Sequence, residues 1–334
     1  MVAPALRAPI GVWQTLQKRQ TMHSYPAHHS LRELIDDWRS RPRPVVVALV
    51  LATSGSSYRK PGALALIDAD GLAIGCISGG CLEADLVASA LPLLGGGACL
   101  RKSFDTRGDD DRWFGSQSGC RGEVEVLLWA STGSAHVLLE TLVLADDAHA
   151  STLVDARDPL AAPRVGLGAP VDGGHCLAIA PPPRLLLLGA GPEAPALIAM
   201  LRTLGWRIDV VEHRERYLAG DRLGQADLVI AARPATALAE GLPLAHFDAA
   251  LCATHLFDED RDCLQVLADS AIPLLGLLGP PARRDELLAE LGPECSARLD
   301  GRLEGPIGLM LGAHGPAAVA LSIAARLTQR FGHV

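Results

Sequence analysis

The segment Arg184-Leu185-Leu186-Leu187-Leu188-Gly189-Ala190-Gly191-Pro192-Glu193-Ala194 decides how the second half of this chain folds. An apolar run that enters a G-x-G-x-x-A turn is typical of a buried strand followed by a helix. We expect that helix to reach Leu204 and to end at Gly205, before a strand over residues 207–211 that leads to Glu212. This order of elements predicts a Rossmann-like domain with a doubly wound parallel sheet.

Four residues of this domain are candidates for binding a nucleotide-like ligand, such as NAD(P). Gly189 makes the tight turn, and Gly191 lets a pyrophosphate approach the backbone. Glu212 is placed to accept a hydrogen bond from a ribose 2′-hydroxyl. His255 follows the predicted strand 247–254, where it is either a base or ligand contact or a cap of the next helix. The fold alone does not decide the function, because many Rossmann domains bind different ligands or none.

The remainder of the second half continues the alternation of strands and helices. Further strands are predicted over residues 227–232 and 272–278, and helices near 236–240, 258–268, 283–291 and 316–329. Pro181-Pro182-Pro183 is a stiff linker that marks the clearest boundary in the chain. The predicted organisation is a flexible tail over residues 1–29, a mixed α/β domain over 30–130, a connecting region over 131–183 and the Rossmann-like domain over 184–331.

The mixed α/β domain is expected to contain a helix that begins with a capping box at Ser30 and a buried strand over residues 45–52. A hairpin over 63–67 and 72–77 then delivers the chain to a glycine turn, and a helix follows over 82–91. Two later strands are predicted over 98–104 and 124–128.

The glycine turn of this domain has the sequence Gly75-Cys76-Ile77-Ser78-Gly79-Gly80-Cys81-Leu82-Glu83. Gly79 and Gly80 allow a bulky ligand to approach the backbone, and Cys81 stands where unpaired N–H groups at a helix start favour a thiolate. The alternative is a buried, inert thiol, since cysteine is often buried and Glu83 would raise its pKa. Cys120 lies in a second glycine-flanked turn before a strand, and two such cysteines are more suggestive than one.

The loop Thr53-Ser54-Gly55-Ser56-Ser57-Tyr58-Arg59-Lys60-Pro61-Gly62 is rich in hydroxyl groups and glycine. Such a loop can hold a phosphate, with Ser56 donating a hydrogen bond and Arg59 supplying positive charge. An ordinary surface turn is an equally good interpretation of the same residues.

Composition bounds the function further. With 334 residues the chain can form two domains, and its net charge of −8 argues against a nucleic-acid partner. No apolar run approaches the roughly 18–20 residues that a membrane span needs. The eight cysteines include no Cys-x-x-Cys pair, so we expect reduced thiols in a cytoplasm. Residues 1–29 lack a secretory signal and are interpreted as a flexible tail, or as the product of a start codon placed ahead of a true start at Met22.

Taken together, these motifs resemble the XdhC/CoxI family, whose members are accessory proteins that mature molybdenum hydroxylases. The resemblance covers most of the chain beyond residue 30. It rests on motifs in both domains: Gly55-Ser56-Ser57, Pro61-Gly62, Ser78-Gly79-Gly80-Cys81-Leu82-Glu83, Gly119-Cys120-Arg121-Gly122, Gly189-Ala190-Gly191, Thr254-His255, Gly276-Leu277-Leu278-Gly279 and Gly305-Pro306-Ile307-Gly308-Leu309.

The resemblance implies a protein that binds the molybdenum cofactor (Mo-molybdopterin), protects it during sulfuration by a cysteine desulfurase, and delivers it to a hydroxylase such as xanthine dehydrogenase. It implies an accessory factor rather than a catalyst, and it is the only basis for expecting a homodimer. Cys81 and Cys120 match the family's cysteine positions and are the candidate molybdenum ligands. Departures occur at Arg121, at Pro280-Pro281 and at Met310, and they concern the second domain's ligand more than the cysteines.

Two other functions are compatible with the residues. The first is an NAD(P)-dependent oxidoreductase that uses Gly189, Gly191 and Glu212, although spacing alone points to no accompanying base, proton donor and substrate clamp. The second is an interaction scaffold that binds no small molecule.

Overall fold

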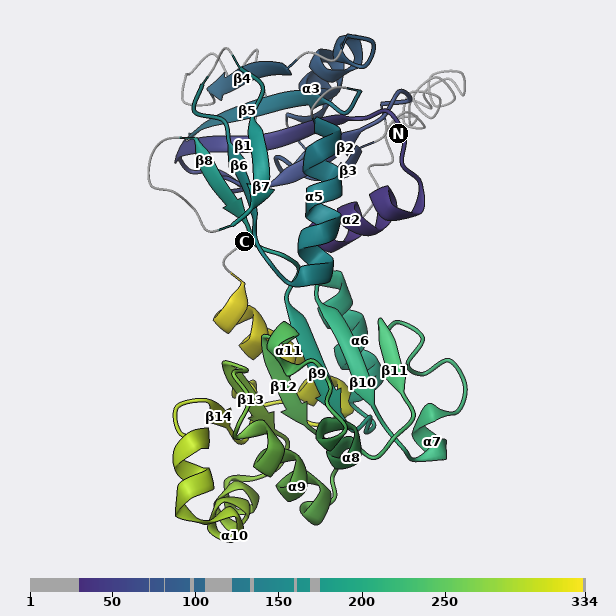
Figure 1. The fold of residues 1–334 in the computed structure, drawn as a ribbon, viewed down its shortest axis with the longest axis vertical. Coiled ribbons are helices and arrows are strands. Elements are labelled where there is room, and N and C mark those ends of the chain that lie inside the picture. The colour runs from purple at the N-terminus through teal and green to yellow at the C-terminus, as the bar shows by residue number, and fades with distance from the viewer. Residues whose placement is uncertain are drawn as a thin grey trace, which may run out of the picture. The chain divides into compact units, whose positions relative to one another are not determined.

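The computed structural model describes residues 30–71, 73–80, 82–96, 99–105, 122–132, 135–158, 161–168 and 175–332. These residues form two compact units. The first unit lies within residues 41–136, and the second consists of residues 30–40 together with the chain from 137 onward (Figure 1). The domain boundaries expected from the sequence stay a prediction.

The first unit is built on a five-stranded sheet in the order β3-β2-β1-β5-β4, in which every neighbouring pair is antiparallel. Its strands are β1 (Val46–Gly55), β2 (Leu64–Ile67), β3 (Ala73–Gly75), β4 (Cys99–Asp105) and β5 (Gly122–Ala130). The first six residues of β1 are all buried, as the unbroken apolar run predicted. All four strand regions expected after β1 are present.

Helix α3 (Glu83–Ala90) covers one face of this sheet and continues as the 3-10 turn η1 (Leu91–Leu93). Leu86 and Ala90 of the helix are buried in the same apolar cluster as Val46, Ala48 and Val50 of β1. Pro92 is compatible with η1 because it lies in the first turn of this 3-10 segment, where a backbone N–H would have no partner within the helix. The core therefore fixes α3 and, with it, the turn that precedes Glu83.

The second unit contains two helices and a small sheet ahead of the Rossmann-like domain. Helix α2 (Leu31–Ser40) begins with the predicted capping box, because the Ser30 N–H donates to Glu33 Oε2 and the Glu33 N–H donates to Ser30 Oγ, at 3.2 and 3.3 Å. Helix α5 (Ala135–Ala148) leads to an antiparallel sheet in the order β7-β6-β8. Its strands are β6 (Thr152–Asp155), β7 (Arg164–Leu167) and β8 (Cys176–Ile179).

The remainder of the second unit is a six-stranded parallel sheet in the order β11-β10-β9-β12-β13-β14. This is the strand order of a Rossmann fold: β10 and β11 lie on one side of β9, and β12, β13 and β14 follow on the other side. Its strands are β9 (Arg184–Leu188), β10 (Arg207–Val211), β11 (Leu228–Ile230), β12 (Ala249–Cys252), β13 (Leu274–Leu277) and β14 (Leu303–Glu304). The predicted fold class is thus confirmed.

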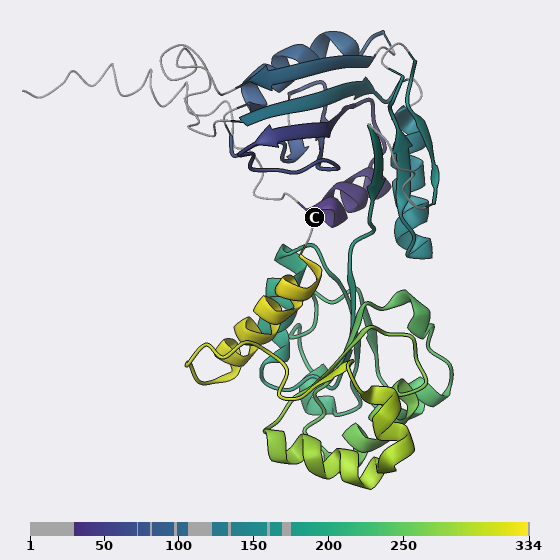
Figure 2. The ribbon, with the colours of Figure 1, turned by 90° about the vertical axis from the view of Figure 1, so that its left-hand side faces the viewer.

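Helices cover both faces of the parallel sheet (Figure 2). Leu185 and Leu187 of β9 face the cluster with α6 and α11, whereas Leu186 and Leu188 face the cluster with α8, α9 and α10. This alternation explains the uninterrupted leucine run, since both faces of a parallel strand are buried. The helices are α6 (Ala194–Thr203), α7 (Glu215–Leu218), α8 (Pro234–Ala239), α9 (Phe257–Leu267), α10 (Pro281–Leu299) and α11 (Pro316–Phe331), with a 3-10 turn η2 (Leu244–His246).

Helix α10 differs from the expected helix over 283–291. It continues to Leu299 after a break at Gly292, where φ is +78° and Pro293 follows. The sequence therefore predicted the first segment, and the second begins where glycine allows a change of direction. Across the described residues, no helix combines the length and the apolar character that crossing a membrane requires.

Candidate functional site

Two predicted motifs of the first unit come together at the glycine turn. Tyr58, from the hydroxyl-rich loop, lies over Gly79, so that a Cβ added at Gly79 would be 3.7 Å from Tyr58 Cδ2. The Tyr58 side chain is 69% exposed, and Gly79 and Gly80 are exposed as well. Among the described residues other than its chain neighbours, none has an atom within 4 Å of a Cβ added at Gly80. The turn thus presents open backbone beside an aromatic ring.

The third motif reaches the same loop from the start of β5. Gly122 pairs with Gly55 of β1, and a Cβ added at Gly122 would collide with the Ser56 carbonyl oxygen. Glycine is therefore required at this position by close backbone approach. Ser56 is exposed, and Arg59 is half-buried. The loop over 53–62 is consequently the element that contacts both of the other motifs.

A buried carboxylate, Glu83, holds the glycine turn in shape. Glu83 Oε1 accepts the Ser78 N–H at 2.8 Å, and Oε2 accepts the Leu82 N–H at 3.1 Å together with the Ser78 hydroxyl. Ser78 Oγ in turn accepts the N–H groups of Gly80 and Leu82, at 3.3 and 3.1 Å. Both side chains are buried, so hydrogen bonds to Ser78 and Glu83, rather than to water, hold the turn in shape.

Cys76 is a further thiol in this cluster. Its Sγ lies 3.7 Å from Glu83 Oε1 and also contacts the Ser78 carbonyl oxygen. Burial, followed by the negative charge of Glu83, raises the pKa of the Cys76 thiol to about 11, although the Arg59 guanidinium acts in the opposite direction. Cys76 is therefore a protonated, buried thiol at neutral pH. Cys76, Glu83 and Tyr58 were not predicted as site residues, because each acts through contacts that the motif alone does not indicate.

Cys81 and Cys120, the candidate molybdenum ligands, lie outside the described residues, and their roles stay predictions. Within the described part of the chain, no cluster of three or more histidine, cysteine or acidic side chains is arranged to hold a metal ion.

In the second unit, the glycine turn after β9 lies against the end of β12. Gly189 has φ of +94°, and a Cβ added there would be 2.6 Å from the Ala253 carbonyl oxygen. The Gly189 N–H donates to the Val211 carbonyl oxygen at 2.8 Å. The turn therefore sits between the carboxyl ends of β9, β10 and β12, as the motif predicted.

Glu212 is fully buried, and its carboxylate accepts five hydrogen bonds from the chain itself. Three come from the N–H groups of Ala190, His213 and Arg214, each at 2.8 Å. The Arg214 guanidinium supplies two more, from Nε at 2.8 Å and Nη2 at 2.6 Å. Burial opposes ionisation of Glu212, but the hydrogen bonds from Arg214 and Ala190 outweigh it and lower the carboxyl pKa to about 2.

His255 stands at the end of β12 in a left-handed conformation, with φ of +61°. Its Nε2 lies 3.3 Å from Glu193 Oε1, across the glycine turn. The hydrogen bond with Glu193 raises the pKa of the imidazole, although partial burial acts in the opposite direction. The structure therefore brings two predicted residues, Gly191 and His255, to one place, together with Glu193, which was not predicted as a site residue.

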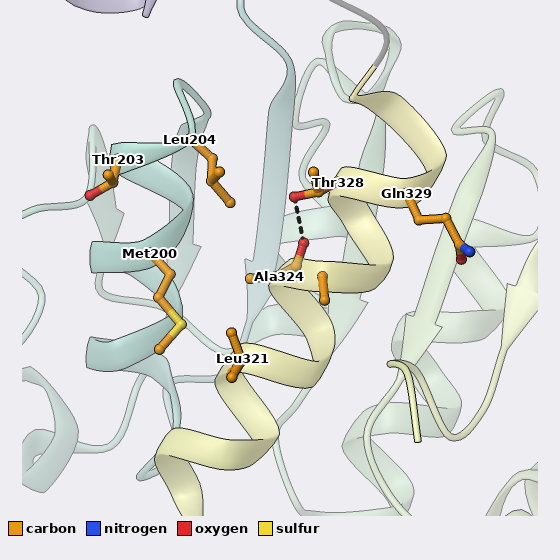
Figure 3. A pocket seen from close by; sticks show the side chains of 8 residues that line it. Met200, Thr203, Leu204, Leu321, Ala324, Thr328 and Gln329 are labelled. Carbon is orange, nitrogen blue, oxygen red and sulfur yellow. Dashed lines mark hydrogen bonds between the residues drawn. The ribbon is translucent and has the colours of Figure 1, made fainter. Parts of the chain in front are cut away.

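An apolar groove lies between α6 and α11, away from these charged groups (Figure 3). Its volume is about 650 Å³, and its lining comprises Met200, Thr203, Leu204, Leu321, Ala324, Ala325, Thr328 and Gln329. The Thr328 hydroxyl donates to the Ala324 carbonyl oxygen within α11, at 2.8 Å. The lining contains no titratable side chain, so this groove offers no groups for acid–base chemistry.

Comparison with known proteins gives matches for both units. Residues 38–105 match a family model described as the XdhC and CoxI family, and residues 185–327 match one described as the XdhC Rossmann domain. A probable xanthine dehydrogenase subunit of Bacillus subtilis is 28% identical over 335 residues, covering 90% of this chain and 96% of the relative. An uncharacterised protein of Escherichia coli, YqeB, is 29% identical over 148 residues, 44% of this chain and 27% of that protein.

A crystal structure titled as a xanthine dehydrogenase from Bacillus halodurans has the same fold. It superposes with a TM-score of 0.77 at 28% sequence identity, covering 90% of this chain and 95% of the other. The likeness therefore extends over most of the chain.

Proposed function

The chain belongs to the XdhC/CoxI family, and from this premise we propose that it binds the molybdenum cofactor and delivers it to an apo molybdenum hydroxylase of the xanthine dehydrogenase type. In this proposal the cofactor is cargo, held by the first unit while a cysteine desulfurase supplies its terminal sulfur. The likeness to a probable xanthine dehydrogenase subunit supports the association with such a hydroxylase. A homodimer is part of the proposal only through family resemblance.

The observation that carries the proposal is the meeting of three motifs at one end of the first sheet. The loop over 53–62 touches the exposed glycine turn through Tyr58, and it touches the start of β5 through Ser56. Cys81 directly follows Gly80 in the chain, and Cys120 precedes Gly122 by two residues. Each candidate cysteine thus lies within two residues, in the sequence, of the glycine turn or of the start of β5.

The donor set at this end of the sheet suits an anionic ligand that carries molybdenum and sulfur. Thiolates are soft ligands appropriate to such a metal, which is the role proposed for Cys81 and Cys120. The Arg59 guanidinium and the Ser56 hydroxyl would hold the terminal phosphate by charge-assisted hydrogen bonds. Gly79 and Gly80 leave the backbone open to a flat ligand, while Ser78 and Glu83 keep the turn in place.

The test is equilibrium binding of molybdenum cofactor to the wild type, Cys81→Ala and Cys120→Ala. Cys99→Ala is the matched control, because Cys99 is an exposed cysteine on β4 of the same unit. We expect at least one of the two variants to weaken binding by more than about tenfold, the loss that removing even an outer partner of a metal produces. Activation of the apo-hydroxylase should fall in parallel. Affinities equal to that of Cys99→Ala in both variants would refute the proposal.

A further inference from the structure

The strand order places the expected ligand crevice of the Rossmann sheet at the carboxyl ends of the neighbouring strands β9 and β12. Strands β10 and β11 extend the sheet outward from β9, whereas β13 and β14 extend it outward from β12, so the chain reverses its winding direction between β9 and β12. In open α/β sheets, ligands bind at the carboxyl ends of the strands at such a point, and the second glycine of the motif gives a pyrophosphate access to the backbone. Gly191 is that glycine in this chain.

The space beside Gly191 is already taken by two side chains. A Cβ added at Gly191 would lie 2.5 Å from Glu193 Oε1 and 2.5 Å from His255 Nε2. Glu193 is 5% exposed and occupies the N-cap position of α6. A helix start favours an anion such as phosphate, and here the Glu193 carboxylate, which makes no capping hydrogen bond, lies in the space where a phosphate group would approach Gly191.

The contacts around His255 fix this arrangement from the other side of the crevice. Thr254, which precedes it, is buried, and its hydroxyl donates to Asp260 Oδ1 at 2.6 Å. The Thr254 carbonyl oxygen accepts a hydrogen bond from Arg214 Nη1 at 2.8 Å. A non-glycine residue with positive φ is uncommon and persists where its surroundings hold it. His255 is therefore held in place opposite Glu193.

The second group that recognises a dinucleotide is also engaged within the chain. A ribose hydroxyl would need a free lone pair on Glu212, but a carboxylate offers about four such sites, and Glu212 already accepts five hydrogen bonds. Its bidentate partner, Arg214, also reaches the Thr254 carbonyl oxygen, so that the pair joins the ends of β10 and β12. Glu212 is thereby committed to holding the crevice together.

We propose that Glu193 sets the ligand class of the Rossmann crevice by excluding phosphate from the glycine turn. The domain then takes no dinucleotide, and it admits only a ligand that is neutral or cationic where it meets Glu193. This inference concerns the second unit alone, so it stands or falls independently of cofactor binding by the first unit.

The test is a gain of binding by substitution of Glu193, with ADP, NADH and inorganic pyrophosphate as probes. Binding is measured by titration calorimetry on the full chain, and NADH binding also by fluorescence. Glu193→Gln removes the charge and keeps the shape, whereas Glu193→Ala also opens the space beside Gly191. Glu240→Ala, at an exposed acid of the same domain, is the control.

We expect affinity for the phosphate-bearing probes to rise in the order wild type, Glu193→Gln, Glu193→Ala. The rise should be at least about tenfold for Glu193→Ala, since like-charge juxtaposition is costly in a binding site. Glu240→Ala should behave as the wild type. Thermal unfolding establishes that each variant is folded. If Glu193→Ala does not fold, the comparison of Glu193→Gln with the wild type tests the proposal. Binding of ADP by the wild type within about threefold of Glu193→Ala would overturn the proposal, and so would absence of binding by folded variants.

Discussion

Arg32 Nη2 lies 2.6 Å from Asp227 Oδ1, and this ion pair ties helix α2 to the segment before β11. The Arg32 side chain is 2% exposed, and its Nη1 also donates to the Trp206 carbonyl oxygen. Residues 30–40 precede the first sheet in the sequence, yet these contacts belong to the second unit. A buried guanidinium thus attaches the first helix of the described chain to the Rossmann-like domain.

We therefore expect Arg32→Ala to lower the free energy of unfolding of the second unit by about 3 kcal/mol, because it removes charge-assisted hydrogen bonds to the Asp227 carboxylate and to the Trp206 carbonyl oxygen, each worth about 1.5–3 kcal/mol. Urea unfolding followed by circular dichroism measures this change.

Arg39→Ala is the control, since Arg39 is 42% exposed and its shorter ion pair, at 2.7 Å, is with the exposed Asp147. Arg39 also lies 3.5 Å from the buried Asp146, but that carboxylate keeps a closer partner in Arg207, at 2.7 Å. Arg39→Ala should cost less than about 1 kcal/mol. Equal decreases in the free energy of unfolding of the two variants would show that the buried Arg32 pair stabilises the second unit no more than a surface pair does.

The second prediction concerns the reactivity of Cys76. Its thiol is buried and has a pKa raised to about 11 by burial and by Glu83, so only about one molecule in a thousand carries the thiolate at pH 8. Iodoacetamide at pH 8 should label the exposed Cys99 well before Cys76, as measured by peptide mass spectrometry. Glu83→Gln should speed the labelling of Cys76 at pH 9. Labelling of Cys76 as fast as Cys99 in the wild type would contradict the assigned environment.

The third prediction follows from the His255–Glu193 hydrogen bond, which raises the imidazole pKa in the folded protein. A raised pKa means that the folded state binds the proton more tightly than the unfolded state does. The resulting stabilisation is complete below the unfolded pKa of about 6.5 and is lost as the pH rises through the folded value. NMR titration of His255 should give a pKa above 6.5 in the wild type and a lower one in Glu193→Gln. An unchanged pKa in that variant would remove Glu193 as the cause.

Local motifs were enough to predict most of the fold. The run into Gly189 and Gly191 specified strand, turn and helix, since each requirement of that turn is met within a few residues. The capping box at Ser30 and Glu33 was likewise visible, because its two hydrogen bonds join residues three apart. The packing of that helix against the Rossmann-like domain could not be predicted, because the contact between Arg32 and Asp227 joins residues that are 195 positions apart in the sequence.

The candidate sites were predicted less completely, because their contacts also join residues that are far apart in the sequence. His255 and Glu193 meet across 62 residues, and no local pattern indicates that they face each other. Tyr58 and Gly79 meet only because β1 and the glycine turn reach the same end of the sheet. Glu212 is the exception, since Arg214 lies only two residues further along. An arginine so close to a predicted ribose-binding acid was a usable signal of internal pairing.

The last prediction tests whether the Glu212–Arg214 pair is a structural clamp. Arg214→Met would leave the buried Glu212 carboxylate with backbone N–H donors alone, and breaking a buried ion pair costs about 3–5 kcal/mol. Because the carboxyl pKa is lowered to about 2, its contribution should be present above the unfolded pKa of about 4.3 and be lost as the pH falls toward 2. Urea unfolding at pH 7 and pH 3 should therefore show a large difference between wild type and Arg214→Met at pH 7 and a smaller one at pH 3. Arg216→Met, which removes a neighbouring exposed arginine that also lies over the Tyr217 ring, should change stability by less than about 1 kcal/mol. If Arg214→Met is as stable as Arg216→Met at pH 7, the carboxylate is not held by this pair and Glu212 becomes available to a ligand.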